Sequence, residues 1–548
     1  MAHPLRLWSR RVRRAAATRG RHMHSDSGHT QSVWMDTAEV PEYPALMENA
    51  RADVCVVGAG IAGLTTAYLL AQEGKSVVLL DDGPIAGGET GRTTAHLTNV
   101  FDDRYYEVER EHGTAAARLT LRSHTTAVDT IERIVRNESI DCDFRRLDGW
   151  LFLSEADARK RPDILDKEEE VSHRLGMTVD RAARAPIPRF DTGPALRYPN
   201  QAQFHPIKYL AGLAHAFTKL GGRIHTRSHV ESIKGGERPK VKTSDGHTVN
   251  CGAVCVCTNS PISDYVVTHL KQAAYRTFVI GARIAGGAVP AGLYWDTPSP
   301  YHYVRLMTGA DSGDDILIAG GEDHKTGQED DAGERFRRLE EWTRDRFPIG
   351  DVQYRWSGQV LEPADYLAFI GPNPDGAKNV YLATGDSGNG MTHGTIAGIL
   401  LTDLIFGRPN PWAELYDPKR VSLKSAPDLL KENFNVAVQY ADWVKPGEAS
   451  SADDIPPGEG AVLRRGVHRV AAYRDDDGNI HERSAVCTHL ACVVRWNSTE
   501  KSWDCPCHGS RFDAYGNVVN GPALMALGPA EPEHRQAPGK EHAAPGPA

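Results

Sequence analysis

The sequence predicts an α/β lobe of Rossmann type, a second lobe rich in β-strands, and a small all-β domain at the C-terminal end. Three observations support this architecture. A short apolar strand runs into a glycine turn and a helix near residue 58. Segments with strand-like alternation recur between residues 141 and 356, and short valine-rich runs separated by turns follow residue 454.

The composition is that of a globular protein with several folding units. The chain has 548 residues, too many for one ordinary core, and 40% of them are hydrophobic and 25% charged. A formal net charge of -9 argues against a nucleic-acid-binding protein, whose binding domain is usually basic. No apolar run approaches the length of a membrane span, so we expect no integral membrane segment and a cytoplasmic location.

The N-terminal end is basic. No acidic residue precedes its arginines, which are Arg6, Arg10, Arg11, Arg13, Arg14, Arg19 and Arg21. The apolar segment that a secretion signal needs does not follow them. We expect residues 1–30 to be a disordered basic extension, with an organellar transit peptide as the alternative.

Residues 53–82 have the pattern of a βαβ unit. We expect a strand over Val54–Val57, a helix from Ile61 to about Gly74 and a second strand over Ser76–Leu80. The segment between the first strand and the helix reads GAGIAG, which is the glycine pattern of a dinucleotide-binding turn.

The residues of this turn suggest how a dinucleotide would bind. Gly58 permits the tight turn, Gly60 lets the backbone approach a pyrophosphate, and Gly63 lets helix and strand pack closely. The phosphates would then meet unpaired N–H groups at the start of the helix. Asp81, followed by Asp82, ends the second strand, where a carboxylate can accept hydrogen bonds from a ribose.

The next segment, residues 85–98, is a glycine-rich turn followed by hydroxyl residues such as Thr93. Such a turn brings N–H groups and hydroxyls against a cofactor, and Arg92 can offer its charge to a phosphate or a substrate. An ordinary surface loop is the alternative.

The middle of the chain alternates helices and strands. We expect a helix within residues 109–139, a strand, turn and strand over 141–154, a helix and strand over 203–233, and a buried strand over 253–261. Cys255 and Cys257 alternate with valines and are therefore expected to be packed thiols.

Residues 274–356 are again strand-rich. Tyr303 and Arg305 lie two residues apart and therefore share one face of a strand. If that face lines a cavity, Arg305 can hold a substrate carboxylate in a bidentate pair. A structural salt bridge at the surface is the alternative.

A second glycine segment lies within residues 378–405. A buried strand leads to a loop with Gly385, Gly388 and Gly390, and a helix is expected to begin near Met391. The positive end of that helix suits a flavin, whose reduced ring carries negative charge. His393 is either a hydrogen-bonding partner of the flavin or only a residue at the start of the helix.

Together these segments resemble the D-amino-acid oxidase-like, or glycine oxidase-like, family of FAD oxidoreductases over residues 31–415. The resemblance rests on VVGAGIAGLTTAYLL, GGETGRTTAHLT, WSGQVLEPADYLAFIG and ATGDSGNGMTHG. It implies an FAD lobe interleaved with an antiparallel substrate lobe, and oxidation of a small amine, amino acid or hydroxy acid. The late glycine segment has no cysteine, and Arg92 stands where some members have a histidine, so noncovalent FAD is expected.

Residues 416–453 have the character of a helical segment and a Pro/Gly/Ser-rich linker, and we place the start of the all-β domain near Asp454. The domain is expected to end near residue 528. A tail rich in Pro, Ala and Gly follows at residues 529–548 and is expected to be disordered.

The all-β domain contains CTHLAC at 487–492 and CPCHGS at 505–510. Both loops resemble those of a Rieske [2Fe-2S] site, in which two thiolates and two imidazoles bind the two irons. The resemblance implies Cys487, His489, Cys505 and His508 as ligands and, as in the respiratory branch, a disulfide between Cys492 and Cys507. A structural zinc site is the alternative.

Three residues near these loops bear on the reduction potential of the cluster. Ser510 matches the serine that donates a hydrogen bond in the family, whereas Phe512 stands where respiratory members have a tyrosine, and Ala491 where glycine is usual. Because hydrogen bonds to the cluster raise its potential, we expect a potential below that of respiratory Rieske proteins.

The whole chain resembles bacterial FAD-dependent oxidoreductases with a C-terminal Rieske domain. We therefore expect a dehydrogenase that oxidises a small molecule at the flavin and passes electrons singly through the cluster to an external carrier protein or quinone. An oxidase that uses O2, with a structural or redox-sensing Rieske domain, is the alternative. An electron-transfer module fed by NAD(P)H is disfavoured because a second nucleotide fingerprint is missing, and a zinc protein without enzymatic activity is the fourth hypothesis.

Overall fold

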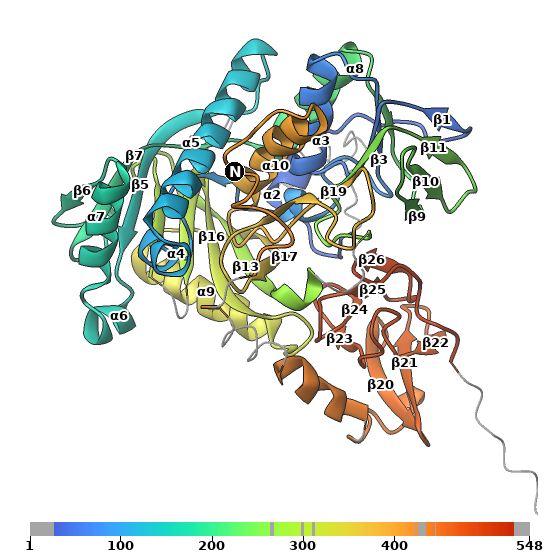
Figure 1. Cartoon of the computed structure of the whole chain (residues 1–548). Helices are drawn as coiled ribbons and strands as arrows, with labels where there is room; N and C mark the ends of the chain where they lie inside the picture. The colour runs from blue at the N-terminus through green and yellow to red at the C-terminus, as the bar shows by residue number, and fades with distance from the viewer. Residues whose placement is uncertain are drawn as a thin grey trace, which may run out of the picture.

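The structure, a computed structural model, describes residues 27–263, 268–297, 301–308, 313–421, 424–425, 434–443 and 445–530. Figure 1 shows the C-terminal domain, in red and orange, beside a larger body formed by two lobes. The extension and tail expected at the two ends lie outside the described residues, apart from 27–30 and 529–530. Of the helical segment expected within 416–453, residues 434–439 are helical, followed by η3 (Tyr440–Trp443).

The α/β lobe is built on a six-stranded sheet in which five strands run parallel and one edge strand runs antiparallel. Its strands, in spatial order, are β18 (Phe369–Pro372), β19 (Val380–Thr384), β12 (Ala253–Val256), β2 (Val54–Val57), β3 (Val77–Leu80) and β8 (Arg223–His225). The predicted first strand and glycine turn lie near the centre of this sheet.

Both faces of this sheet are covered, which explains why its strands are apolar throughout. Val54 and Val56 pack in one core and Cys55 and Val57 in another, because successive side chains point to opposite faces. Helices cover the first face: α3 (Ile61–Gln72), α8 (Pro206–Lys219) and α10 (Gly390–Ile405). A four-stranded sheet covers the other: β1 (Ala50–Arg51), β11 (Thr248–Asn250), β10 (Lys240–Thr243) and β9 (Val230–Lys234).

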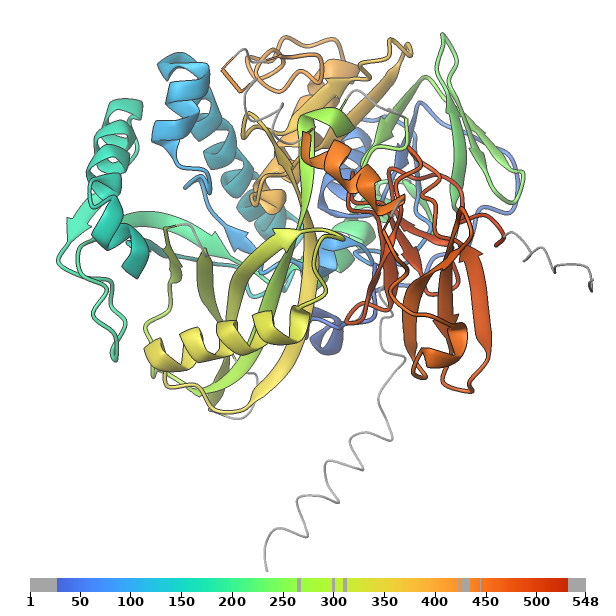
Figure 2. The ribbon, with the colours of Figure 1, turned by 90° about the horizontal axis from the view of Figure 1, so that it is seen from below.

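The second lobe is one large sheet, antiparallel except where β14 pairs with β5. Its strands, in spatial order, are β17 (Val352–Pro363), β13 (Gln272–Ala285), β16 (Asp314–Lys325), β15 (His302–Met307), β14 (Leu293–Asp296), β5 (Arg145–Phe152), β7 (Ala195–Gln203) and β4 (His96–Leu97), with β6 (Asp180–Ala182) paired to β7. Phe336 and Leu339 of α9 (Ala332–Arg346) pack with Phe278 of β13, so this helix covers one face, as Figure 2 shows.

Three local expectations for this lobe need correction. The expected strand, turn and strand over 141–154 is the single strand β5, in which a register shift between Leu147 and Gly149 replaces the turn. The helix expected within 109–139 is two helices that break at Gly113, whose φ is 85°. The stretch read as strand-rich also contains α9.

Among the remaining helices of the two lobes, α5 (Thr114–Asn137) is long and packs against α10, and the others are shorter. These shorter helices are α2 (Val33–Thr37), α4 (Tyr105–His112), α6 (Glu155–Lys160), α7 (Ile164–Leu175), η1 (Glu89–Arg92) and η2 (His269–Lys271). No helix in the described parts of the chain is both long enough and apolar enough to cross a bilayer.

The C-terminal domain consists of two small antiparallel sheets. Its elements are η4 (Ala452–Asp454), β20 (Glu459–Arg465), β21 (His468–Arg474) and β22 (Ile480–Ser484) in the first part, and β23 (Arg495–Asn497), β24 (Ser502–Asp504), β25 (Arg511–Asp513) and β26 (Val518–Asn520) in the second. Both cysteine- and histidine-containing loops belong to the core around Trp503 and Phe512.

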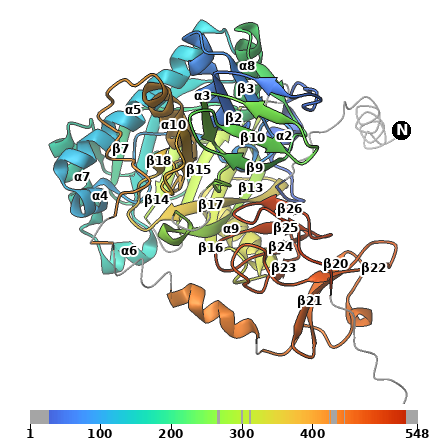
Figure 3. The same ribbon diagram turned by 45° about the vertical axis from the view of Figure 1, so that its right-hand side comes forward.

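A buried group of charges joins the C-terminal domain to the larger body. Arg92 forms an ion pair with Glu500 at 3.1 Å, and both side chains are fully buried. Arg511 pairs with Asp504 at 3.2 Å and lies 3.8 Å from Glu89 of the α/β lobe. Figure 3 shows β23–β26 lying along β13 and β17, so this contact fixes the domain against both lobes.

Candidate active site and metal centre

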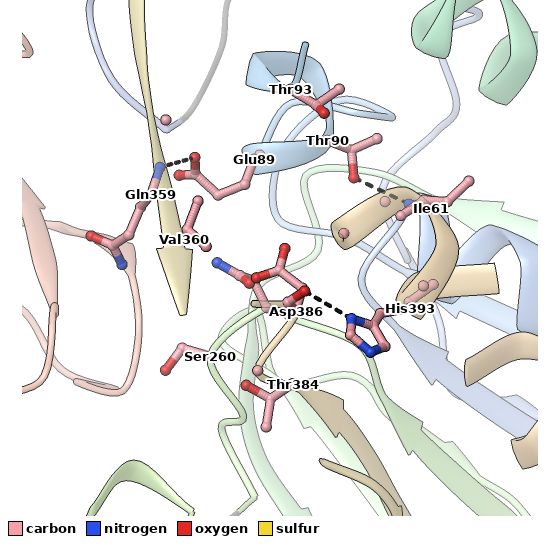
Figure 4. Close-up of a pocket in the computed structure, with 18 of the residues that line it drawn as sticks. Ile61, Glu89, Thr90, Thr93, Ser260, Gln359, Val360, Thr384, Asp386 and His393 are labelled. Carbon is pink, nitrogen blue, oxygen red and sulfur yellow. Dashed lines mark hydrogen bonds between the residues drawn. The ribbon is translucent and has the colours of Figure 1, made fainter. Parts of the chain in front are cut away.

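One large cavity, of about 620 Å³, lies where the α/β lobe, the large sheet and the C-terminal domain meet. Figure 4 shows part of its wall, with Ile61 and Thr90 on one side and Ser260 and Thr384 on another. Every cofactor-binding residue expected from the sequence lines this cavity except Gly63. The volume lies within the range of small-molecule and cofactor sites.

The glycine turn has the geometry that close approach of a pyrophosphate requires. Gly58 has φ +105°, and a Cβ there would lie 2.3 Å from the carbonyl oxygen of Cys257. A Cβ on Gly63 would lie 1.8 Å from the carbonyl oxygen of Gly58, so Gly63 serves helix packing beneath the turn. The backbone N–H of Ile61, the first residue of α3, donates to Thr90 Oγ1 at 3.2 Å.

The acidic end of β3 lies against the same turn. Asp81 accepts hydrogen bonds from the backbone N–H groups of Ala59 and Gly83, and Asp82 lies 3.2 Å from the Nδ1 of His229. Both carboxylates line the cavity. Their contact with a ribose stays a prediction.

The second glycine segment lies beside the first, because α10 packs against α3 and a Cβ on Gly394 would lie 2.5 Å from the Ile61 side chain. Gly385, Gly388 and Gly390 line it, and α10 begins at Gly390, one residue before the predicted start at Met391. His393 lies in the first turn, and its Nδ1 is 2.8 Å from the carbonyl oxygen of Asp386, as Figure 4 shows. Burial lowers the pKa of His393 to about 4, so the imidazole is neutral at physiological pH.

The charge of Arg92 has a different partner from the phosphate or substrate that the sequence suggested. The guanidinium pairs with Glu500 of the C-terminal domain and donates to the carbonyl oxygens of Thr30 and Ser357. Arg92 therefore joins two domains, although part of it lines the cavity. Thr93, the next residue, also lines the cavity.

Tyr303 and Arg305 share a strand face but lie at different distances from the cavity. Tyr303 lines the cavity and its hydroxyl lies 2.6 Å from Thr277 Oγ1. Arg305 does not line it. Its guanidinium is buried and donates to the carbonyl oxygens of Ala95 and Phe204 at 2.7 and 3.0 Å. The expectation that Arg305 holds a substrate carboxylate is therefore wrong, and so is its alternative of a surface salt bridge.

Carboxylates outnumber guanidinium groups in the cavity wall by nine to three. They are Asp81, Asp82, Glu89, Asp102, Asp103, Glu107, Asp323, Glu362 and Asp386, against Arg92, Arg104 and Arg161. Such an excess of negative charge favours a cationic ligand.

Several of these acids have perturbed pKa values. Burial raises the pKa of Asp103 to about 7, in spite of a 2.7 Å hydrogen bond from Ser387 Oγ, and raises that of Asp386 to about 7. Burial and then the neighbouring acids raise the pKa of Glu362 well above its usual value. No local pattern in the sequence indicates this cluster, because its members come from separate loops and strands.

Two further contributions to the cavity were missed by the sequence analysis. Gln359 of β17 lines the cavity, and its side-chain amide donates to the carbonyl oxygen of Gly509 at 3.0 Å, in the second cysteine- and histidine-containing loop. Residues of β26 and the loop after it also line the cavity. Neither could be found without knowing how the domains pack.

The four expected metal ligands lie together at the tips of the two loops. The imidazole rings of His489 and His508 are 5.0 Å apart, and the thiols of Cys487 and Cys505 are within hydrogen-bond distance of each other. His508 is buried, yet neither of its ring nitrogens has a hydrogen-bond partner among the described residues. Two buried thiols beside such imidazoles fit the donor set of a Rieske cluster.

The surroundings of this centre also match the resemblance. A disulfide joins Cys492 to Cys507, so these sulfurs are unavailable to a metal. The Ser510 hydroxyl lies within hydrogen-bond distance of the Cys487 sulfur and accepts from the backbone N–H of Ala523 at 3.0 Å. Phe512 is fully buried and offers no hydroxyl.

The imidazole edge of this centre faces the larger body of the molecule. His269 of η2 packs edge-on against His489, with ring centroids 5.5 Å apart, and both rings are buried. The metal centre and the cavity therefore both lie along the interface between the domains.

Comparisons with known proteins agree with this geometry. Residues 53–404 match the family model described as FAD dependent oxidoreductase, and residues 445–530 match that of the Rieske [2Fe-2S] domain. The second match begins nine residues before the boundary we placed at Asp454.

Three similar proteins illustrate the two halves. YhfW of Bacillus subtilis, named as a Rieske 2Fe-2S iron-sulfur protein, is 34% identical over 91% of this chain and 97% of its own length. Gamma-glutamylputrescine oxidoreductase of Escherichia coli is 27% identical over 69% of this chain and 89% of its own. The structure of glycine oxidase from Geobacillus kaustophilus, 17% identical, covers 68% of this chain and all of its own with a TM-score of 0.56, which shows a shared fold.

The first family model spans more than half of the chain, and the relative from Bacillus subtilis extends over both halves. The cavity with two glycine segments and the paired cysteine and histidine loops are the sites that we predict for the FAD and the [2Fe-2S] cluster of these two families. This chain belongs to the FAD-dependent oxidoreductases of the D-amino-acid oxidase-like family and carries a Rieske [2Fe-2S] domain at its C-terminal side.

Proposed function

We propose that this protein is an amine dehydrogenase that exports electrons through its Rieske cluster. In the reaction, a cationic amine loses one proton to become neutral, and the neutral amine then loses two electrons and two protons and becomes an imine, which water hydrolyses to a carbonyl compound and ammonia. FAD supplies the two-electron acceptor, and the cluster passes these electrons one at a time to two equivalents of an external one-electron acceptor.

The contact between Gln359 and Gly509 is the observation that carries the proposal. One side chain touches the flavin cavity and also the loop that holds His508. The buried pair of Arg92 and Glu500 also holds the C-terminal domain against the body of the molecule. A cluster held so close to the flavin site is suited to receive its electrons within the chain.

The charge of the cavity supports an amine as the substrate. Nine carboxyl groups against three guanidinium groups line the cavity, and those that are ionised attract a cation, while Arg305, the residue expected to bind a substrate carboxylate, is buried elsewhere. The relative from Escherichia coli is named gamma-glutamylputrescine oxidoreductase, and the compound in that name is an amine.

The residues of the chain would position this substrate rather than transfer its hydrogen. Asp103 and Asp386 can attract the ammonium group as they ionise near neutral pH. Tyr303 and Tyr301 supply aromatic walls, and Tyr301 donates to Asp102 at 2.8 Å. The ammonium must lose a proton before the neutral amine can give a hydride, and ionised Asp103 or Asp386 would accept that proton, so that no base is required at the C–H bond.

Turnover with alternative oxidants tests the proposal. Protein containing both cofactors should oxidise diamines or other cationic amines with an artificial one-electron acceptor, at a rate at least tenfold above that with O2 alone. Release of stoichiometric hydrogen peroxide at an equal or higher rate with O2 would show an oxidase instead. Oxidation of anionic hydroxy acids in preference to amines would contradict the assignment of the substrate.

A further inference from the structure

The C-terminal domain forms part of the wall of the FAD cavity. Its contribution is one continuous stretch, of which Val518, Val519, Asn520, Gly521, Ala523 and Leu524 line the cavity. FAD-dependent oxidoreductases of this family match the chain only over residues 53–404, so this stretch lies outside the part that the family model covers.

Three polar atoms in this part of the wall have no hydrogen-bond partner among the described residues. They are Nδ2 of Asn259, Oγ of Ser260 and Oδ1 of Asn520, and all three are buried. Buried polar groups normally have partners, and leaving one unpaired costs about 1–3 kcal/mol. The residues that carry these atoms all line the cavity, so a polar ligand bound there is placed to pair with them.

These atoms come from two domains that touch at this point. Asn259 and Ser260 follow β12, whose end lies against Gly58 of the pyrophosphate-binding turn. Gly521 packs against Ser260, where a Cβ would lie 3.4 Å from the Cβ of Ser260. Asn520, the preceding residue, thus lies across the domain boundary from the glycine turn.

The chemistry of the three atoms suits the polar part of a dinucleotide. Asn259 offers a donor, Asn520 offers an acceptor, and the Ser260 hydroxyl can do either. The hydroxyl groups of FAD both donate and accept hydrogen bonds, so they can pair with all three atoms. A purely anionic group could not pair with Asn520 Oδ1, which only accepts.

We propose that Asn520 of the Rieske domain is an FAD-binding residue, so that the FAD site is shared between two domains. Asn259 and Ser260 bind the cofactor from the opposite side of the boundary. The proposal concerns binding alone and holds whether the electrons later go to the cluster or to O2.

The same stretch contacts the metal centre on its other side. The backbone N–H of Ala523 donates to Ser510 Oγ, which lies within hydrogen-bond distance of the Cys487 sulfur. Residues 518–524 therefore form a common wall between the two cofactors. Loss of this wall would affect the FAD site even if the α/β lobe stayed intact.

The affinity of the full-length protein for FAD tests this proposal. FAD is removed and its rebinding followed by the quenching of flavin fluorescence, in wild type, Asn520→Ala and Asn517→Ala. Asn517 is three residues earlier, is exposed and lies outside the cavity, so it is the matched control. We expect Asn520→Ala to raise the Kd for FAD about tenfold and Asn517→Ala to leave it within twofold.

Two further measurements separate binding from a structural effect. The EPR signal of the reduced cluster should be the same in all three proteins. The thermal midpoint without FAD should also be unchanged in Asn520→Ala, because its Oδ1 has no protein partner to lose, whereas the stabilisation by added FAD should fall.

A double variant gives an independent check across the domain boundary. Ser260→Ala should weaken FAD binding by itself, and its effect combined with Asn520→Ala should not be additive if both residues bind one ligand. An unchanged Kd in Asn520→Ala would overturn the proposal. A raised Kd that is accompanied by a lower midpoint of the FAD-free protein would overturn it as well.

Discussion

Replacing Glu500 by glutamine should loosen the C-terminal domain from the rest of the protein. Glu500 pairs with Arg92 and also accepts from the N–H and the hydroxyl of Thr30, at 3.0 and 2.6 Å, and from Ser357. Glutamine has nearly the same shape but no charge. The change therefore tests the charge of Glu500 and leaves its volume in place.

The size of the expected loss of stability follows from the buried charges around Glu500. Arg92, Arg276 and Arg511 are buried there with Glu500, Asp504 and the less buried Glu89, so three positive charges face three negative ones. Burial and then Arg511 lower the pKa of Arg276 to about 10. Removing one negative charge leaves a net positive charge in the interface, and breaking a buried pair in this way costs about 3–5 kcal/mol.

Urea unfolding of the holoprotein, followed by the Rieske circular dichroism bands, measures this loss. Glu237→Gln is the control, because Glu237 pairs with Lys378 at the surface with 80% of its side chain exposed, and such pairs contribute at most about 1 kcal/mol. Glu500→Gln should lower the midpoint clearly and Glu237→Gln hardly at all. Equal shifts in the two variants would refute the role of the buried charges.

The pKa of Glu500 predicts how the stability of the domain interface depends on pH. Burial opposes the ionisation of Glu500, but Arg92, Arg276 and Arg511 hold its pKa well below its usual value. A depressed carboxyl pKa stabilises the folded state above the unfolded pKa, which is about 4.3 for glutamate, and this stability is lost as the pH falls below that value. Wild type should therefore lose interface stability in acid, and Glu500→Gln should lose less.

Four further predictions concern the two redox sites. For a cationic amine, kcat/KM should rise between about pH 6 and 8 as Asp103 and Asp386 ionise, and a flat profile would contradict their role. Arg305→Met should lower thermal stability and leave KM unchanged, since Arg305 binds backbone carbonyls; a selective change in KM would show contact with substrate. Phe512→Tyr should raise the cluster potential in an EPR-monitored redox titration, because the new hydroxyl can donate a hydrogen bond to the cluster, and an unchanged potential would contradict this reasoning. Gln359→Leu should slow electron transfer to the cluster while flavin reduction keeps its rate, and equal slowing of both steps would contradict a linking role.

The parts of the fold that were predicted correctly depend on local patterns. The strand over Val54–Val57 and the helix from Ile61 follow from a short apolar run and a glycine turn whose backbone must approach its neighbours closely. The break at Gly113 was missed because apolar spacing continues on both sides of it. The turn expected near Gly149 was wrong because a glycine can also sit in a strand beside a bulky side chain, here Trp295.

The parts that were missed depend on contacts between distant segments. Arg92 pairs with a residue 408 positions away, and no local pattern shows this. The alternation of side chains along a strand predicts that Tyr303 and Arg305 share one face. It does not predict how deeply each side chain is buried. The acidic lining and Asn520 meet the cavity only after two lobes and a separate domain have packed together.

The central claim is that electrons pass from the flavin to the Rieske cluster inside one chain. Anaerobic rapid mixing of the holoprotein with a cationic amine, followed by flavin absorbance and freeze-quench EPR of the cluster, measures both centres in the same reaction. We predict that the flavin band bleaches first and that the EPR signal of the reduced cluster follows within the time of one turnover. A bleached flavin beside a cluster that stays oxidised until oxygen is admitted would contradict the account.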